Sequence, residues 1–92
     1  AMLVVVDVRS AKEWHQGHIE GSINIPLSHL HERATELPAH QSVVVHCKGG
    51  YRSSIAASIL QQQGIEQVFD LVGGFDAWTA SKLPVVEPAA TN

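Results

Sequence analysis

Two valine-rich runs constrain the fold more than any other feature of this sequence. The segments LVVVDVR (3–9) and SVVVHC (42–47) are almost continuously apolar, whereas a strand with one solvent-exposed face alternates apolar and polar residues. Continuous runs of this kind are typical of strands that are buried on both faces of a parallel sheet. Parallel neighbours need crossover connections, which are usually helices, so the two runs predict an α/β domain.

The patterns between these runs supply the remaining elements. We expect short strands within 22–26 and 68–72, and helices within 10–21, 27–40, 52–64 and 75–81. Ser10 and Ser28 are the expected N-caps of the first two helices, and Gly17 is the expected end of the first. The chain then forms a single domain over 1–92, with a small, mostly parallel sheet of about four to five strands and helices on both faces. The tail over 85–92 is expected to be irregular.

Composition narrows the classes of partner. The chain is 45% apolar and 16% charged, and nine acids against six bases give a net charge of −3. This balance excludes a disordered segment and provides no basic surface for nucleic acid. No apolar run approaches the roughly 18 residues of a membrane span, and no secretory signal is visible, so we expect a cytoplasmic protein with no membrane partner. The opening Ala1-Met2 suggests a domain excised from a longer chain.

The stretch that follows the second valine run carries the most chemistry. A buried strand ends at Cys47, the loop KGGYR follows, and a helix is expected over Ser53–Gln63. Two adjacent glycines allow the loop to curl so that successive backbone N–H groups point inward and bind an anion. The positive end of the following helix adds to this field and lowers the pKa of the thiol. Cys47 is therefore the candidate nucleophile.

The other side chains of this loop are candidates for substrate binding. Lys48 and Arg52 place two of the six cations beside the cysteine, which favours a small anion as the ligand. Ser53 is expected to cap the helix and to hydrogen-bond the sulfur. Tyr51 either lines the rim of the loop or is simply exposed.

Neighbouring residues have mainly structural interpretations. His46 and Cys47 are adjacent on a strand and point to opposite faces, so His46 is expected to be packed rather than paired with the thiol. Asp7, Arg9 and Glu13 are expected to form a charge network, and Arg9 is also a candidate for the binding site.

One edge of the sheet is expected to gather these groups. The carboxyl ends of parallel strands share an edge, so Arg9, Cys47 and the pair Gly73-Gly74 should lie together there, with the glycines allowing close backbone approach. Trp78, on the last helix, is expected in the core. A lone cysteine excludes an internal disulfide, and no second cysteine completes a metal site, so we expect neither a metal nor a cofactor.

Four motifs resemble those of rhodanese-like domains, in the order in which that family has them. They are DVRSAKEW (7–14), GHIEGSINIP (17–26), CKGGYRS (47–53) and GGFDAW (73–78), and the resemblance covers nearly the whole chain. It implies a sulfurtransferase in which Cys47 takes a sulfane sulfur from thiosulfate or a low-molecular-weight persulfide and passes it to a thiol or cyanide. It also implies that the donor and the persulfide are held by Lys48, Gly49, Gly50, Tyr51, Arg52 and Ser53, with Arg9 nearby.

Loop length decides between the chemistries that this architecture allows. Cys47 through Arg52 is six residues, as in the sulfurtransferases that the chain resembles, whereas the phosphatase type has one residue more. One residue fewer removes about 3.5 Å of contour, or roughly 0.5 Å of radius, which is comparable with the tolerance of catalytic geometry. The alternatives are a small cysteine phosphatase or arsenate reductase, and a non-catalytic binding module of a larger protein. The run GYRSSIAAS (50–58) also resembles rhodanese-like domains that are fused to a metallo-β-lactamase-fold partner.

Overall fold

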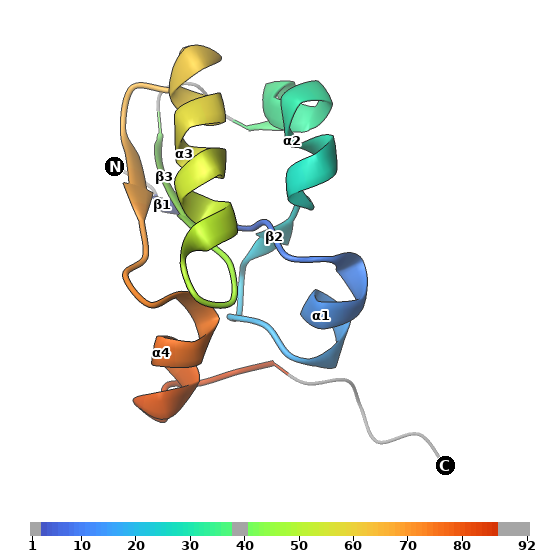
Figure 1. The fold of residues 1–92 in the computed structure, drawn as a ribbon, viewed down its shortest axis with the longest axis vertical. Helices are drawn as coiled ribbons and strands as arrows, with labels where there is room; N and C mark the ends of the chain where they lie inside the picture. The colour runs from blue at the N-terminus through green and yellow to red at the C-terminus, as the bar shows by residue number, and fades with distance from the viewer. Residues whose placement is uncertain (1–2, 38–40, 87–92) are drawn as a thin grey trace.

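A four-stranded parallel sheet organises the structure, a computed structural model that describes residues 3–37 and 41–86. The strands are β1 (Leu3–Asp7), β2 (Ile23–Asn24), β3 (Ser42–His46) and β4 (Val68–Asp70), in the spatial order β2-β1-β3-β4. The helices are α1 (Ala11–Gln16), α2 (Leu27–Arg33), α3 (Tyr51–Gln62) and α4 (Gly74–Ala80), with a 3₁₀ turn over Ala34–Glu36 (Figure 1). Every neighbouring pair of strands is parallel, which confirms the predicted α/β class and sheet.

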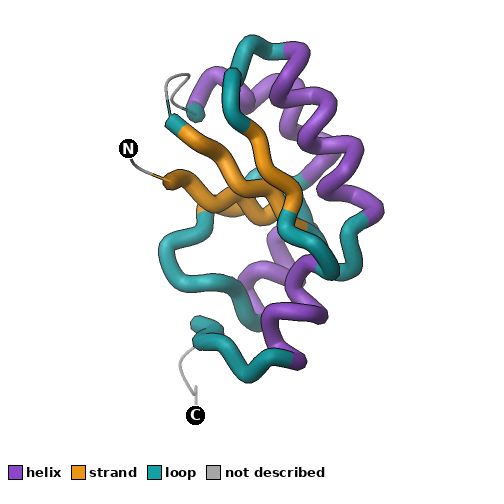
Figure 2. Tube along the Cα trace, turned by 90° about the vertical axis from the view of Figure 1, so that its left-hand side faces the viewer, coloured by secondary structure: helices purple, strands orange, loops and turns teal. Residues whose placement is uncertain are grey.

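The two faces of the sheet are covered unequally (Figure 2). One face packs against α2 and α3 and forms the core, whose fully buried side chains include Val6, Leu30, Val43, Val45 and Leu60. On the other face, Phe75 of α4 stacks on His46 at the carboxyl end, with ring centroids 6.4 Å apart. The amino end of this face is open, with Leu3 59% and Phe69 54% exposed. Helices thus reach both faces, but the first valine run is buried on both sides only in its carboxyl half.

Helix boundaries follow local chemistry where the sequence supplies a cap. Ser10 caps α1 through a capping box with Glu13, and Gly17 ends the helix, as predicted. Ser28 is not a cap, because α2 begins at Leu27 directly after Pro26. The Leu27 N–H is already used by the Val8 carbonyl, at 3.0 Å, and the fixed φ of proline suits a helix start. No helix in the described part of the chain is long and apolar enough to cross a membrane.

The segment after α4 is more ordered than the sequence predicted. Val86 forms an isolated antiparallel bridge with His18, so the predicted irregular tail contains at least one backbone pairing. Residues 87–92 of that tail lie outside the described residues, as do residues 38–40 of the range 27–40 that was predicted to contain the second helix. Trp78 was predicted in the core, but it is only half-buried, and its indole N–H donates to the Pro84 carbonyl at 2.7 Å. This hydrogen bond therefore holds the segment that follows α4 against the helix.

Backbone contacts hold α4 against the loop that follows β3. The Phe75 N–H donates to the Cys47 carbonyl at 2.7 Å, and the Asp76 N–H donates to the Lys48 carbonyl at 3.0 Å. Gly74 makes this approach possible, because a Cβ at that position would collide with both carbonyl oxygens and its φ is +59°. Arg9, Cys47 and the glycine pair therefore share one edge of the sheet, as predicted.

Gly74→Ala should destabilise the protein more than an alanine at another glycine with positive φ. Its Cβ would lie 2.8 Å from the Lys48 carbonyl oxygen, and an overpacked backbone contact of this kind adds to the left-handed strain, for a total of about 3 kcal/mol. Gly21→Ala is the matched control, because its φ is +81° and no atom lies within 4 Å of the added Cβ. Urea unfolding should show a loss of only about 1 kcal/mol in that control, and equal losses in both variants would contradict the close-approach argument.

Candidate active site

Cys47 lies at the carboxyl end of β3, inside a loop whose backbone points toward its sulfur. The Sγ atom accepts hydrogen bonds from the N–H of Gly50 at 3.1 Å and the N–H of Ser53 at 3.3 Å. Gly50 precedes α3 with φ of +112°, which turns the chain so that the first helical N–H groups face the sulfur. Cys47 is 1% exposed, so the sulfur lies almost entirely beneath the surface of the loop.

This environment favours the thiolate form of Cys47. Burial raises the pKa of the thiol, but the hydrogen bond between the thiol and the Ser53 hydroxyl, together with the N–H groups of Ser53, Gly50 and Arg52, outweighs burial and lowers the pKa. The N-terminus of α3 directs its positive end toward the same atom. The predicted anion-binding curl is therefore present, and it acts on the sulfur itself.

Ser53 is not the helix cap that the sequence predicted. It is the third residue of α3, where it is fully buried, and Gly50 occupies the cap position because the loop already curls there. The hydroxyl proton of Ser53 has two acceptors within reach, Asp70 Oδ1 at 2.6 Å and the Gly50 carbonyl at 3.2 Å, and the hydroxyl oxygen accepts a hydrogen bond from the Cys47 thiol at 3.5 Å. The short contact with a carboxylate is the strongest of these, so Ser53 links the sulfur to Asp70.

Asp70 was not among the residues predicted for the site. It ends β4, next to the strand that carries Cys47, and this placement at the carboxyl edge is the signal that could have found it. Sequence spacing gave no reason to pair it with Ser53, because the contact depends on the register of β4 against β3, which places Asp70 beside Val45.

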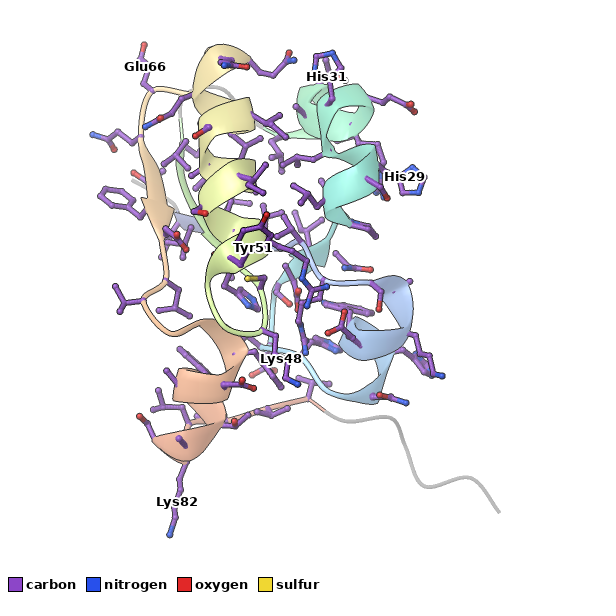
Figure 3. The ribbon with its side chains drawn as sticks, viewed as in Figure 1. His29, His31, Lys48, Tyr51, Glu66 and Lys82 are labelled. Carbon is purple, nitrogen blue, oxygen red and sulfur yellow. The ribbon has the colours of Figure 1, made fainter. Side chains whose placement is uncertain are left out.

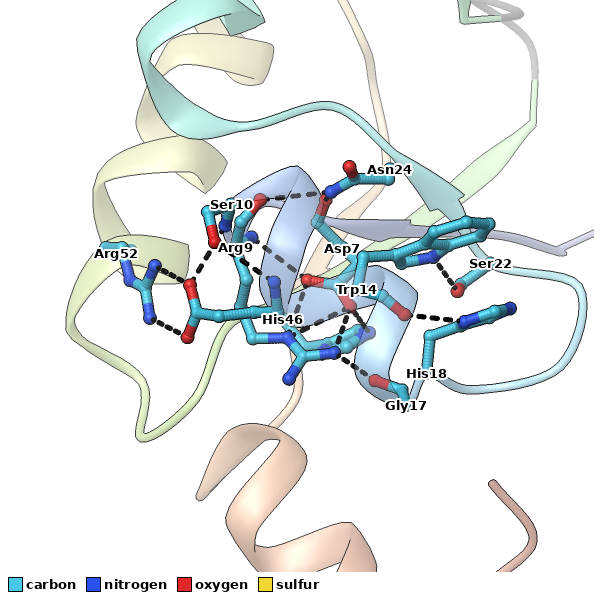
Figure 4. Close-up of polar contacts among 11 residues, drawn as sticks. Asp7, Arg9, Ser10, Trp14, Gly17, His18, Ser22, Asn24, His46 and Arg52 are labelled. Carbon is cyan, nitrogen blue, oxygen red and sulfur yellow. Dashed lines mark hydrogen bonds and ion pairs between the residues drawn. The ribbon is translucent and has the colours of Figure 1, made fainter. Parts of the chain in front are cut away.

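Arg52 is paired rather than free to attract a ligand. Its Nη1 lies 2.8 Å from Glu13 Oε1 and its Nη2 lies 3.1 Å from Glu13 Oε2, a two-pronged contact between α3 and α1 (Figure 4). The hydrogen bond from Arg52 is the main cause that holds the pKa of Glu13 at about 2, so the carboxylate is charged at neutral pH. The predicted network of Asp7, Arg9 and Glu13 is therefore wrong in its membership, since Glu13 belongs with Arg52.

Asp7 and Arg9 form a second, buried ion pair. Arg9 Nη2 lies 2.8 Å from Asp7 Oδ2, and the same nitrogen donates to the Gly17 carbonyl at 2.8 Å. The guanidinium carbon lies 4.0 Å from the centre of the Phe75 ring, so α4 covers one side of its plane. Figure 4 shows Arg9 between Asp7 and Gly17, with one nitrogen that makes no drawn contact.

Two cavities border the Cys47 loop. The first, which we call the Lys48 cavity, has a volume of about 420 Å³ and lies between α1, Lys48 and α4; Arg9 and Glu13 also line it. The second, the Arg52 cavity, has a volume of about 360 Å³ and is lined by Arg52 and by residues at the starts of α1 and α2. The Glu13–Arg52 pair contributes one residue to each cavity and so forms part of the wall between them.

The remaining loop residues lie at the surface. Lys48 and Gly49 are exposed, and Tyr51 is 80% exposed at the start of α3 (Figure 3). Of the two interpretations offered for Tyr51, simple exposure on the rim fits its position. Of the predicted substrate-binding cations, only Lys48 has no ion pair within the described residues.

His46 is a packed residue, as predicted. It is fully buried on the face opposite Cys47, and neither ring nitrogen has a hydrogen-bond partner in the described residues. Burial lowers the pKa of its imidazole despite Asp7 Oδ2 at 3.8 Å, which favours the neutral form of the ring. Within the described ranges, no three His, Cys, Asp or Glu side chains gather as a metal ion would need.

Known proteins resemble this chain over most of its length. The family model for the rhodanese-like domain matches residues 1–81. A sulfurtransferase from Allochromatium vinosum is 37% identical, over 94% of this chain and 80% of its own length. Thiosulfate sulfurtransferase GlpE from Coxiella burnetii is 31% identical, over 85% of this chain and 73% of its own length.

The fold is also found in a solved structure. The crystal structure of a rhodanese-related protein from Thermoplasma volcanium matches with a TM-score of 0.86 at 38% identity, covering 91% of this chain and 83% of that one. Two relatives from Bacillus subtilis are longer, and the chain spans 59% and 42% of their lengths. Family match, motif order and fold agree, and the chain belongs to the rhodanese-like domain family.

Proposed function

We propose that the protein is a sulfurtransferase that carries a sulfane sulfur as a persulfide on Cys47. The observation that carries this proposal is the convergence of the Gly50 and Ser53 N–H groups on a thiol whose pKa they lower. In the first half-reaction the Cys47 thiolate attacks the outer sulfur of thiosulfate, a new S–S bond forms, and sulfite leaves with the electron pair of the broken bond. An acceptor thiolate or cyanide then attacks the outer sulfur of the persulfide and restores the Cys47 thiolate.

The loop suits a persulfide in size and polarity. A persulfide places its outer sulfur about 2.0 Å beyond Sγ, toward the mouth of a loop that is one residue shorter than the phosphatase type. The inward N–H groups stabilise negative charge without a general base. Names of relatives support the same chemistry, since one is a sulfurtransferase and another a thiosulfate sulfurtransferase. Thiosulfate and low-molecular-weight persulfides are the proposed donors, and a thiol is the proposed acceptor.

One observation favours a non-catalytic binding module as the second candidate. Cys47 is 1% exposed, which is unusual for a group that must meet two reactants. The two cavities beside the loop argue for access after small side-chain movements, and the persulfide test separates the two functions.

Incubation with thiosulfate should add one sulfur to the protein, because the loop stabilises the attacking thiolate. Intact mass should show the addition in wild type and not in Cys47→Ala, and cyanide should remove it with release of thiocyanate. A wild type that gains no sulfur from thiosulfate or from glutathione persulfide would favour the binding module.

The reactivity of Cys47 should titrate below the ordinary thiol value. A lowered pKa means that the thiolate fraction, and with it the alkylation rate with iodoacetamide, rises with pH at a midpoint below the usual value of about 8.5. The same protein in guanidinium chloride is the control, and its midpoint should return to about 8.5. Coincident folded and unfolded midpoints would show that the loop does not stabilise the thiolate.

Glu13→Gln should raise kcat/KM for thiosulfate by about fivefold, because it frees the charge of Arg52 from a partly exposed pair. Glutamine preserves the capping box of α1, so the helix should remain intact. Glu66→Gln is the control, since Glu66 lies beyond the far end of α3 from the loop (Figure 3). A fall in kcat/KM would show instead that Glu13 is needed to position Arg52.

A further inference from the structure

The Ser53 hydroxyl lies between the reactive sulfur and a carboxylate of the neighbouring strand. Its oxygen accepts a hydrogen bond from the Cys47 thiol at 3.5 Å, and its O–H donates to Asp70 Oδ1 at 2.6 Å. The second acceptor for this O–H, the Gly50 carbonyl, is farther away at 3.2 Å. Hydrogen bonds to a charged group are shorter and stronger than those between neutral groups, so Asp70 determines where the hydroxyl proton points.

The thiol and the thiolate of Cys47 require opposite orientations of this hydroxyl. A thiol donates its own proton, so the oxygen that Asp70 turns toward it satisfies it. A thiolate only accepts, so it gains from Ser53 only when the O–H turns away from Asp70 and donates to Sγ. Because a hydroxyl has one proton, the carboxylate and the thiolate compete for it. Ser53 is 0% and Cys47 1% exposed, and hydrogen bonds are electrostatically stronger in such a buried place than in water.

Asp70 is placed to hold this hydroxyl from outside the loop. It ends β4, and the parallel register sets it beside Val45 of β3, two residues before Cys47. The residue is exposed, while its contact with Ser53 is partly buried. Its carboxylate forms no ion pair within the described residues, so no cation there competes with the hydroxyl for it. Asp70 also lines neither of the two cavities beside the loop, which separates it from the groups that border them.

Other groups around the sulfur act on it in different ways. The hydrogen bonds that Sγ accepts come from main-chain N–H groups, which do not titrate. The charged or titratable side chains on the surrounding elements are the pairs Asp7–Arg9 and Glu13–Arg52, and the residues His46, Lys48 and Asp76. Within the described residues, none of these side chains has a hydrogen bond to Sγ or to the Ser53 hydroxyl. Asp70 is thus the ionisable side chain that reaches the sulfur through a chain of hydrogen bonds.

We infer that Asp70 is a positioning residue that holds the Ser53 O–H away from Cys47 and so withholds one hydrogen bond from the thiolate. When the thiol releases its proton to solvent, Ser53 has to leave the carboxylate before it donates to Sγ. The main-chain N–H groups therefore set how far the loop favours the thiolate, and Asp70 limits that effect. This function of Asp70 concerns the thiolate itself, and its kinetic consequence rests on the proposed function.

The consequence differs between the two half-reactions. A more basic thiolate is the stronger nucleophile, whereas a less basic thiolate is the better leaving group. By withholding a hydrogen bond, Asp70 favours the attack of Cys47 on the donor and slows the release of Sγ when the acceptor takes the outer sulfur. In the persulfide, Sγ is bonded to a second sulfur and the Ser53 O–H remains with Asp70.

The pH profile of alkylation by iodoacetamide tests the inference in wild type, Asp70→Asn and Asp70→Ala. The reagent is neutral, so a change in charge does not alter its attraction to the site. Asp70→Ala should lower the midpoint by about 1 pH unit, the size expected when the thiolate gains one hydrogen bond. The rate on the high-pH plateau should fall about threefold, because the freed hydroxyl makes the thiolate less basic. Asp70→Asn keeps a neutral acceptor for the hydroxyl and should give a smaller fall in the midpoint.

A second set of variants separates the hydroxyl from the charge. In a Ser53→Ala background, Asp70→Ala should move the midpoint by no more than about 0.3 pH unit, because the link between Asp70 and the sulfur is gone. A charge that acts through space would keep its full effect in that background. Glu66→Gln removes one negative charge beyond the far end of α3, and it should keep the wild-type profile (Figure 3). If Asp70→Ala does not fold, the isosteric Asp70→Asn carries the test with the same sign.

The outcomes distinguish this inference from the proposed function. A midpoint that rises or stays unchanged in Asp70→Ala overturns the inference, and so does an equal fall with and without the Ser53 hydroxyl. Alkylation needs no sulfur donor, so these results stand even if Cys47 gains no sulfur from thiosulfate and the sulfurtransferase proposal fails. Where the persulfide forms, Asp70→Ala should discharge it to cyanide faster than Asp70→Asn does, and a slower discharge overturns the consequence drawn for the second half-reaction.

Discussion

The parallel pairing of β3 between β1 and β4 is the constraint on which the rest of the structure depends. It matches five residues of β1 with five of β3, and it continues past the strands through the bonds Val8 N–H to His46 carbonyl and Leu71 N–H to Val45 carbonyl, each 3.0 Å. The three strands therefore end at the same edge of the sheet. Each strand is followed directly by one part of the site: the Asp7–Arg9 pair after β1, the thiol after β3 and the start of α4 after β4. These parts lie together because the parallel pairing places the carboxyl ends of the strands at one edge.

Charge pairing, rather than the number of charged residues, shapes the chemistry of this edge. The loop region contains three cations, yet Asp7 neutralises Arg9 and Glu13 neutralises Arg52. The thiolate is consequently stabilised mainly by backbone N–H groups, which are fixed in place and lose nothing to reorganisation when negative charge develops. Lys48 has no ion pair within the described residues, and it lies on the wall of the larger of the two cavities beside the loop.

Local patterns predicted the fold well because its determinants are local. The strands of the two valine runs, the N-cap at Ser10 and the glycine turn after Cys47 each depend on a few consecutive residues, and the structure confirms these elements. Contacts between distant segments were not predictable in this way. Glu13 with Arg52, Ser53 with Asp70, and Val86 with His18 each depend on how two elements are offset in space, which a single sequence does not record.

The lengths of the outer strands have a consequence for how the protein behaves at high concentration. Both edges of the sheet are very short, since β2 has two residues and β4 has three. A short edge offers few unsatisfied N–H and C=O groups to a neighbouring molecule, which is one of the ways in which natural sheets avoid joining edge to edge. Phe69 on β4 is 54% exposed, and on a longer edge strand such an exposed aromatic side chain would favour association with a second molecule. The short edge strands thus disfavour edge-to-edge association of a sheet whose second face is open at its amino end.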